Sequence, residues 1–136
     1  MFDRRPEQGL FDVLGMLGVG SIVFSPLAQG MLTDRYLSGS APKGSRASKN
    51  FYLKKDALSE EYLEHARALN QIAAARGQSL AQLAVSWVLR QPTVTSCLIG
   101  ASSVEQLNQN SSALSAPKLN AAELAAIEPH AVNGLV

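Results

Sequence analysis

Two short apolar runs limit what this chain can fold into. Residues 20–24 are apolar and β-branched and are stopped by Ser25-Pro26, and a second run of this kind covers residues 94–99. Proline cannot donate a hydrogen bond to a sheet ladder, so the first run is predicted to be a buried strand that ends there. No further strand is predicted anywhere in the 136 residues.

The rest of the chain is predicted to be helical or irregular. Apolar residues at helical spacing and capping residues predict helices over residues 7–17, 59–77, 79–91, from Ser102 and from Asn120. In the fourth helix Ser102 and Glu105 form the expected capping pair, with Val104 and Leu107 facing inward. The order of elements is that of parallel strands joined by helical crossovers, and the fold class is α/β.

Two strands alone make an incomplete sheet. A parallel sheet is normally covered on both faces and has neighbouring strands, so a two-stranded one leaves edge groups and apolar surface unsatisfied. We therefore expect the chain to be part of a larger α/β fold or to associate with copies of itself.

Composition excludes several classes of protein. The chain is 46% hydrophobic and 17% charged, as in a packed globular protein, and its net charge of +1 provides no field for nucleic acid or an anionic membrane. No apolar stretch is long enough to cross a membrane, and the first residues lack the apolar segment of a signal peptide, so the expected location is the cytoplasm. The single Cys97 is expected to be a buried, inert thiol.

Two loops have the residue types of a ligand site. Residues 24–30 place a Ser-Pro turn and Gly30 after the first strand, and residues 99–106 place Gly100 and two serines after the second. Small residues permit close backbone approach, and a helix N-terminus offers amides to an anion such as phosphate. An ordinary strand exit and a well-capped helix explain each motif equally well when it is taken alone.

Taken in order along the chain, these motifs resemble the aldo-keto reductases, in the branch with bacterial glyceraldehyde 3-phosphate reductases and potassium-channel β subunits. The matching segments are residues 1–4, 18–30, 45–46, 82–87, 95–102 and 105–107. The resemblance implies a (β/α)8 TIM barrel, of which this chain supplies strands 7 and 8 with their helices, incomplete on its own. It treats residues 1–136 as one C-terminal segment, with a cofactor-clamp loop over residues 25–58.

The resemblance also implies an NADPH site. Its nicotinamide and pyrophosphate part consists of Ser25, Pro26, Leu27, Ala28 and Gln29. Arg35 and Arg46 clasp the phosphate and adenosine portion. The part around the 2′-phosphate, ribose and adenine consists of Gly100, Ser102, Gln106, Gln109 and Asn110. Gln109 stands where this branch has glutamate, which makes its contact the least secure.

The family's catalytic residues are expected to lie outside this chain. Members reduce carbonyls with a tyrosine, a lysine, an aspartate and a histidine, which lie on earlier strands of the barrel. The tyrosines and histidines of this chain are instead expected to be surface or packing residues: Tyr36, Tyr52, Tyr62, His65 and His130. Two functions follow as alternatives: the NADP(H)-binding part of a reductase that meets its carbonyl substrate only in a complete barrel, or a nucleotide-binding or interaction module without turnover.

Overall fold

The fold is a two-stranded parallel sheet with helices beside it, as the sequence predicts. The computed structural model describes residues 1–40 and 58–134. In this part β1 (Ser21–Phe24) pairs in parallel with β2 (Val94–Leu98). The helices are α1 (Leu10–Leu17), α3 (Glu60–Ala75), α4 (Leu80–Val88), α5 (Val104–Ser111) and α6 (Ala121–Ile127), with short 3-10 turns η1 (Arg5–Glu7), η2 (Ala28–Gly30), η3 (Asp34–Tyr36), η5 (Ser112–Ser115) and η6 (Glu128–His130).

Local capping signals locate most helix ends correctly. The Ser79 and Asn120 side chains accept hydrogen bonds from the backbone three residues on, and Gln82 and Glu123 return the bond, so both capping boxes are complete. Gly18 ends α1 in the left-handed region, at φ 63°. These helices therefore begin and end where their own sequences dictate.

The start of α5 differs from the prediction by one residue. Ser103, and not Ser102, is the N-cap, and its Oγ accepts a hydrogen bond from the backbone amide of Gln106 at 3.1 Å. The predicted pairing of Ser102 with Glu105 is therefore wrong. Both serines have a suitable partner three residues later, so spacing alone does not distinguish them.

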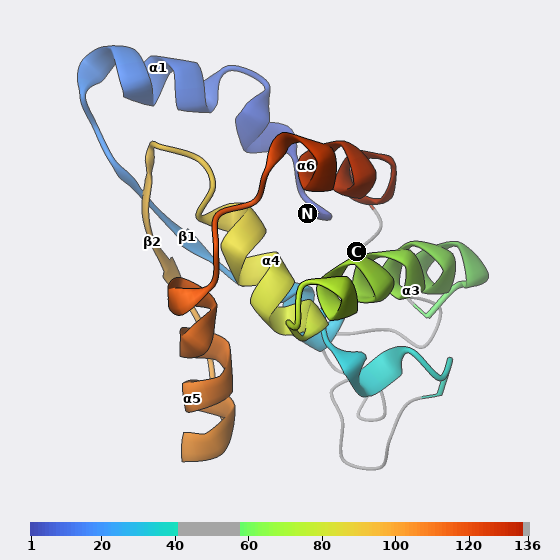
Figure 1. Cartoon of the computed structure of the whole chain (residues 1–136). Helices are drawn as coiled ribbons and strands as arrows, with labels where there is room; N and C mark the ends of the chain where they lie inside the picture. Colours follow the sequence, from blue (N-terminus) through green and yellow to red (C-terminus); the bar gives the residue numbers. More distant parts are fainter. Residues whose placement is uncertain (41–57, 135–136) are drawn as a thin grey trace.

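The hydrophobic core lies on one side of the sheet. Figure 1 shows α3, α4 and α6 together on that side, while α1 and α5 project beyond the opposite ends of the sheet. Aromatic and aliphatic side chains fill the core, and Phe2 meets Tyr62 edge to face with centroids 6.3 Å apart. Tyr36 and Tyr62 are fully buried here, which confirms that both are packing residues.

The strands themselves are not buried, contrary to the prediction. Ile22, Phe24 and Leu98 are 67%, 81% and 61% exposed. The register pairs Ile22 with Ser96 and Phe24 with Leu98, so these side chains share the face that points away from the core. Apolar composition identified the strands correctly, but burial requires partners that the described residues do not provide.

The outer helices α1 and α5 also expose apolar side chains. No residue of α1 is buried, and in α5 Val104 and Leu107 are 75% and 46% exposed, so the expected inward face of α5 is wrong. Apolar stripes on both helices therefore face solvent, in line with the expectation of an incomplete fold.

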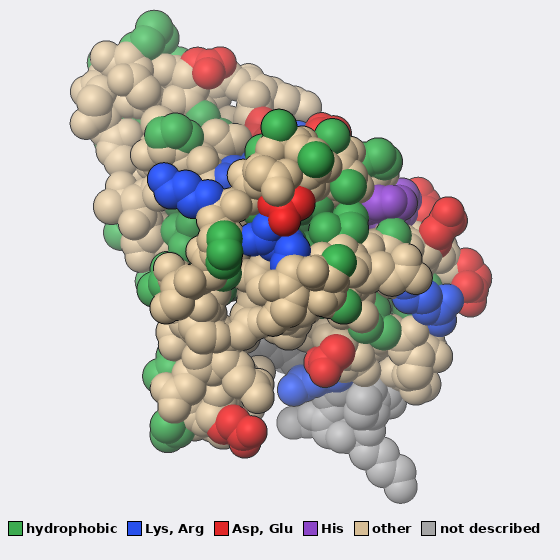
Figure 2. All heavy atoms as spheres, viewed as in Figure 1, with side chains coloured by type: hydrophobic (Ala, Val, Ile, Leu, Met, Phe, Trp, Pro, Cys, Tyr) green, Lys and Arg blue, Asp and Glu red, His purple; other side chains and the backbone are tan. Residues whose placement is uncertain are grey.

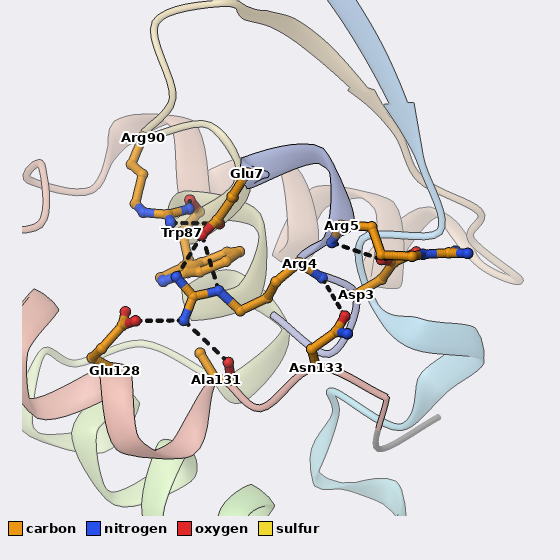
Figure 3. A network of polar contacts seen from close by, with 9 residues as sticks. All are labelled: Asp3, Arg4, Arg5, Glu7, Trp87, Arg90, Glu128, Ala131 and Asn133. Carbon is orange, nitrogen blue, oxygen red and sulfur yellow. Dashed lines mark hydrogen bonds and ion pairs between the residues drawn. The ribbon is translucent and has the colours of Figure 1, made fainter. Parts of the chain in front are cut away.

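A charged network that the sequence did not reveal joins the two ends of the chain (Figure 3). Glu7 accepts hydrogen bonds from Arg4 and, at 2.8 Å, from Arg90. Arg4 also reaches Glu128, and the Arg90 guanidinium lies 3.4 Å above the Trp87 ring. The network fixes the first residues against the end of α4 and the start of η6.

Replacing Glu7 with glutamine should destabilise the chain. Burial would raise the pKa of Glu7, but the hydrogen bonds from Arg4 and Arg90 outweigh it and hold the pKa below its ordinary value. Glu7→Gln should lower the free energy of unfolding by about 1.5–3 kcal/mol at pH 7, because it weakens two charge-assisted bonds. Urea unfolding at pH 7 measures this.

The stability difference between wild type and Glu7→Gln should depend on pH, and a second variant provides a control. A lowered carboxyl pKa stabilises the fold above the ordinary value of 4.5, and the stabilisation is lost as pH falls through the lowered pKa. The difference between wild type and Glu7→Gln should therefore shrink below pH 4.5. Glu128→Gln, at a side chain 59% exposed, should change stability by less than about 1 kcal/mol. Equal effects of the two variants would contradict the assignment.

Candidate functional site

A strained turn follows β1 at the first predicted ligand loop. Ser25, Ala28 and Gln29 have φ angles of 52°, 46° and 57°, which L-residues rarely adopt. Pro26, between Ser25 and Ala28, is buried, and the core residue Met31 follows the turn, so both hold it in place. Clustered left-handed residues are typical of ligand sites, where the surrounding structure maintains the strain.

The second predicted loop lies beside the first. Phe24 pairs with Leu98 in parallel strands, so the residues that follow the two strands leave the sheet at the same end. A Cβ built on Gly100 would meet no atom of residues 1–40 and 58–134 within 4 Å, so this part of the chain does not crowd the position. The structure thus brings the Ser25–Gln29 turn and the Gly100 loop to the same end of the sheet, and it leaves space at Gly100.

Ser102 and Gln106 interact at the start of α5. The Ser102 amide and hydroxyl both donate to Gln106 Oε1, at 2.7 and 3.0 Å. An acceptor oxygen therefore already occupies the position in which a phosphate oxygen would accept these two bonds. The donors fit an anion, provided that the Gln106 side chain turns away from them.

The end of α5 provides a second feature that fits a polar ligand. Asn110 is only 4% exposed, and its Nδ2 has no hydrogen-bond partner within the described residues. A buried amide without a partner is costly, and a ligand acceptor would relieve that cost. Gln109 is exposed, and its carbonyl accepts a bond from Gln82 at 2.8 Å.

The structure says less about the two arginines of the predicted site, Arg35 and Arg46. Arg35 is exposed on η3, where its backbone amide donates to Thr33 at 3.3 Å, so its contact with phosphate stays a prediction. Arg46 lies outside the described residues. In Figure 2 acidic and basic side chains are interspersed over the visible face, with no large area of one sign.

Comparison with known proteins identifies the family. Residues 1–132 match the model of the aldo/keto reductase family. The chain belongs to this family. It is 46% identical over 132 residues to the L-glyceraldehyde 3-phosphate reductase of Escherichia coli K12, and that match covers 94% of this chain and 38% of the relative. It is 35% identical over 117 residues to a probable voltage-gated potassium channel subunit beta of Oryza sativa, covering 84% and 36%.

Solved aldo-keto reductases share this fold. A Bacillus halodurans member in its holo form superposes with a TM-score of 0.69 at 28% identity, over 95% of this chain and 39% of that one. A glycerol dehydrogenase from Gluconobacter oxydans gives 0.73 at 24% identity, over 95% and 39%, and supports the fold alone. This aldo/keto reductase chain therefore spans about two fifths of the length of the relatives that it matches.

Within the described residues, the tyrosines lie in the core and the two histidines pair with each other. Tyr62 Oη donates to the Met31 carbonyl at 2.8 Å, and burial raises the pKa of Tyr62 to about 12. His65 and His130 are half-buried and pair with each other, with their Nδ1 atoms 3.2 Å apart. They face each other, and they join α3 to η6 instead of forming a site with an acid. Tyr52 lies outside the described residues.

Other ligand chemistry is limited over residues 1–40 and 58–134. This part of the chain holds no group of three or more side chains suited to a metal ion, and none of its helices is long and apolar enough to cross a membrane. Cys97 is partly exposed instead of buried, and the burial that it has raises the pKa of the thiol.

Proposed function

We propose that this chain is the NADP(H)-binding portion of an aldo-keto reductase that reduces aldehydes or ketones by hydride transfer. The observation that supports this best is that two loops leave the sheet at the same end. They are the strained Ser25–Gln29 turn after β1 and the Gly100–Gln106 segment after β2. In α/β barrels, loops after adjacent strands together with a helix N-terminus often bind phosphate.

In this proposal β1 and β2 are strands 7 and 8 of the barrel. The nicotinamide and pyrophosphate lie on residues 25–29, and the 2′-phosphate and ribose lie against Gly100, Ser102 and Gln106. Asn110 and Gln109 lie near adenine, and Arg35 and Arg46 clasp the phosphates. The cofactor supplies the hydride, and the protein's part is to hold and orient it.

The carbonyl substrate enters only when the barrel is complete. The proton donor and its three helpers belong, by family resemblance, to strands that this chain does not provide. The chain's own contribution is therefore positioning of the cofactor, and the cytoplasm is the expected setting.

A second function, a nucleotide-binding or interaction module without turnover, is favoured by one observation. The identity of 35% to the rice protein named as a potassium channel subunit is lower than that to the Escherichia coli reductase, yet it extends over 84% of this chain. Binding of NADPH without turnover in a complete barrel would support this alternative.

Exchanging Ser102 for aspartate tests the proposal. A carboxylate at the start of α5 would repel the 2′-phosphate, so the preference for NADPH over NADH should fall by about tenfold or more, since charge-assisted bonds contribute about 1.5–3 kcal/mol. Calorimetric titration of both nucleotides measures this, first with the chain alone and then with the chain joined to the missing part of the Escherichia coli relative.

The matched control is Ser115→Asp, an exposed serine of η5 outside the site. It adds the same charge and should leave the preference unchanged. Equal affinity of the wild-type site for NADH and NADPH would contradict the proposed role of Ser102.

A further inference from the structure

The side chain of Gln82 joins two helices. Its Oε1 accepts a hydrogen bond from the Ser79 amide at 2.8 Å, which completes the capping box at the start of α4. Its Nε2 donates to the Gln109 carbonyl at 2.8 Å and to Ser112 Oγ at 2.7 Å, both at the end of α5. The oxygen of this amide therefore caps α4, and both N–H bonds of its nitrogen reach α5.

The attachment of α5 depends on these bonds. Figure 1 shows α5 projecting from the rest of the molecule, and Asn110 is the one residue of α5 that is buried. Within residues 1–40 and 58–134, Gln82 is the only residue of another α-helix that hydrogen-bonds to α5 or its C-cap. Ser112 Oγ also donates to the Gln109 carbonyl at 2.8 Å, so three residues form a connected set of bonds around this turn. We therefore expect Gln82 to fix the orientation of α5.

The two ends of α5 carry the proposed contacts with the adenine half of the cofactor. Asn110 directly follows Gln109, whose carbonyl Gln82 holds, and the buried Asn110 Nδ2 has no partner in the described residues. Ser102 and Gln106 interact at the other end. At about 1.5 Å per residue the helix is rigid and about 12 Å long, so a tilt at its last turn also moves its first turn.

We propose that Gln82 is a positioning residue of the nucleotide site. Its Nε2 holds α5 in the orientation in which Asn110 meets adenine and Ser102 meets the 2′-phosphate. The inference rests on the proposed function, and it adds a residue that does not itself touch the cofactor. A residue needed only as a cap would be replaceable by glutamate, because a capping box accepts Glu and Gln alike.

Gln82→Glu separates the two roles. Glutamate keeps an oxygen that accepts the Ser79 amide, so the capping box is retained. It removes both donors and places a carboxylate against the Gln109 carbonyl, so α5 loses its attachment. The affinity for NADPH should therefore fall by about tenfold, because the removed donors leave their acceptors unpaired.

Calorimetric titration measures this with the whole chain, alone and joined to the missing part of the Escherichia coli relative. The probes are NADPH and 2′,5′-ADP, its adenine half, and both should lose affinity to the same extent. In the joined protein the KM for NADPH should rise by the same factor while kcat stays within about twofold of wild type. General destabilisation would instead reduce the amount of active protein, which lowers the apparent kcat and leaves the KM unchanged.

Ser79→Ala is the matched control. It removes the cap of α4 but leaves both bonds from Gln82 to α5, so it should lower the urea midpoint, as loss of an N-cap does. Its affinity for 2′,5′-ADP should stay within about twofold of wild type, because the orientation of α5 does not depend on the cap. Amide hydrogen exchange over residues 104–112 should become about tenfold faster in Gln82→Glu and stay unchanged in Ser79→Ala.

The other outcomes overturn the inference. Wild-type affinity of Gln82→Glu for 2′,5′-ADP, an equal loss in Ser79→Ala, a fall in kcat without a rise in KM, or unchanged exchange over residues 104–112 would each show that Gln82 only caps α4. In these cases the wild-type protein still binds nucleotide, and the proposed function stands. Absence of nucleotide binding by wild type in both forms would contradict the proposed function and the role of Gln82 with it.

Discussion

Replacing Trp87 with alanine should lower the free energy of unfolding by about 3–5 kcal/mol. The indole is 4% exposed in the core, and it also supports the charged network, because the Arg90 and Arg4 guanidinium carbons lie 3.4 and 5.6 Å from its ring centroid. Removing the indole leaves a cavity and deprives two partly buried arginines of the ring that they contact. Both effects lower the free energy of unfolding.

This loss is large relative to the whole stability of a domain of this size, about 5–15 kcal/mol. We therefore expect Trp87→Ala to be unfolded or molten at 25 °C, as seen by near-ultraviolet circular dichroism and urea titration. Val104→Ala, at a residue 75% exposed, should stay within about 0.5 kcal/mol of wild type. A Trp87→Ala protein with a wild-type urea midpoint would show that the core does not depend on this ring.

Local signals account for the part of the fold that the sequence predicts well. Capping pairs such as Ser79 with Gln82, and a proline two residues after the end of β1, act over a few residues, so they give the element order and most boundaries. The same local rules failed at α5, where Ser102 and Ser103 have equivalent spacing and only the three-dimensional structure shows which of them is the cap.

Long-range and context-dependent features could not be predicted from the same patterns. Arg4 and Glu7 have helical spacing, but nothing local indicates that Arg90 joins them from the far end of α4. The burial of β1 was overestimated, because an apolar strand is buried only if its neighbours are present. At the candidate site Gly30 indicated a turn, yet the most unusual backbone angles belong to Ala28 and Gln29, which have no sequence signal for a positive φ.

The chain alone should show no NADPH-dependent reduction of glyceraldehyde or a nitrobenzaldehyde above the buffer rate. Under the proposed division of the barrel, the chain has no general acid, whose loss typically costs 10²–10⁴-fold, and it lacks the rest of the nicotinamide pocket, so hydride positioning is lost as well. Tyr36 and Tyr62 are fully buried in the core, so neither is placed to donate a proton to a bound carbonyl.

Joining the chain to the missing part of the Escherichia coli reductase is the corresponding positive experiment. If residues 25–29 and 100–110 form the cofactor half of a working site, NADPH oxidation, followed at 340 nm, should become saturable in the carbonyl and exceed the rate of the chain alone by at least about 10²-fold. The Ser102→Asp form of the joined protein should raise the KM for NADPH and affect kcat less, because the 2′-phosphate is remote from the reacting carbon. Saturable reduction by the chain alone would instead place a proton donor within these 136 residues. It would contradict the proposal that the catalytic residues lie outside this chain.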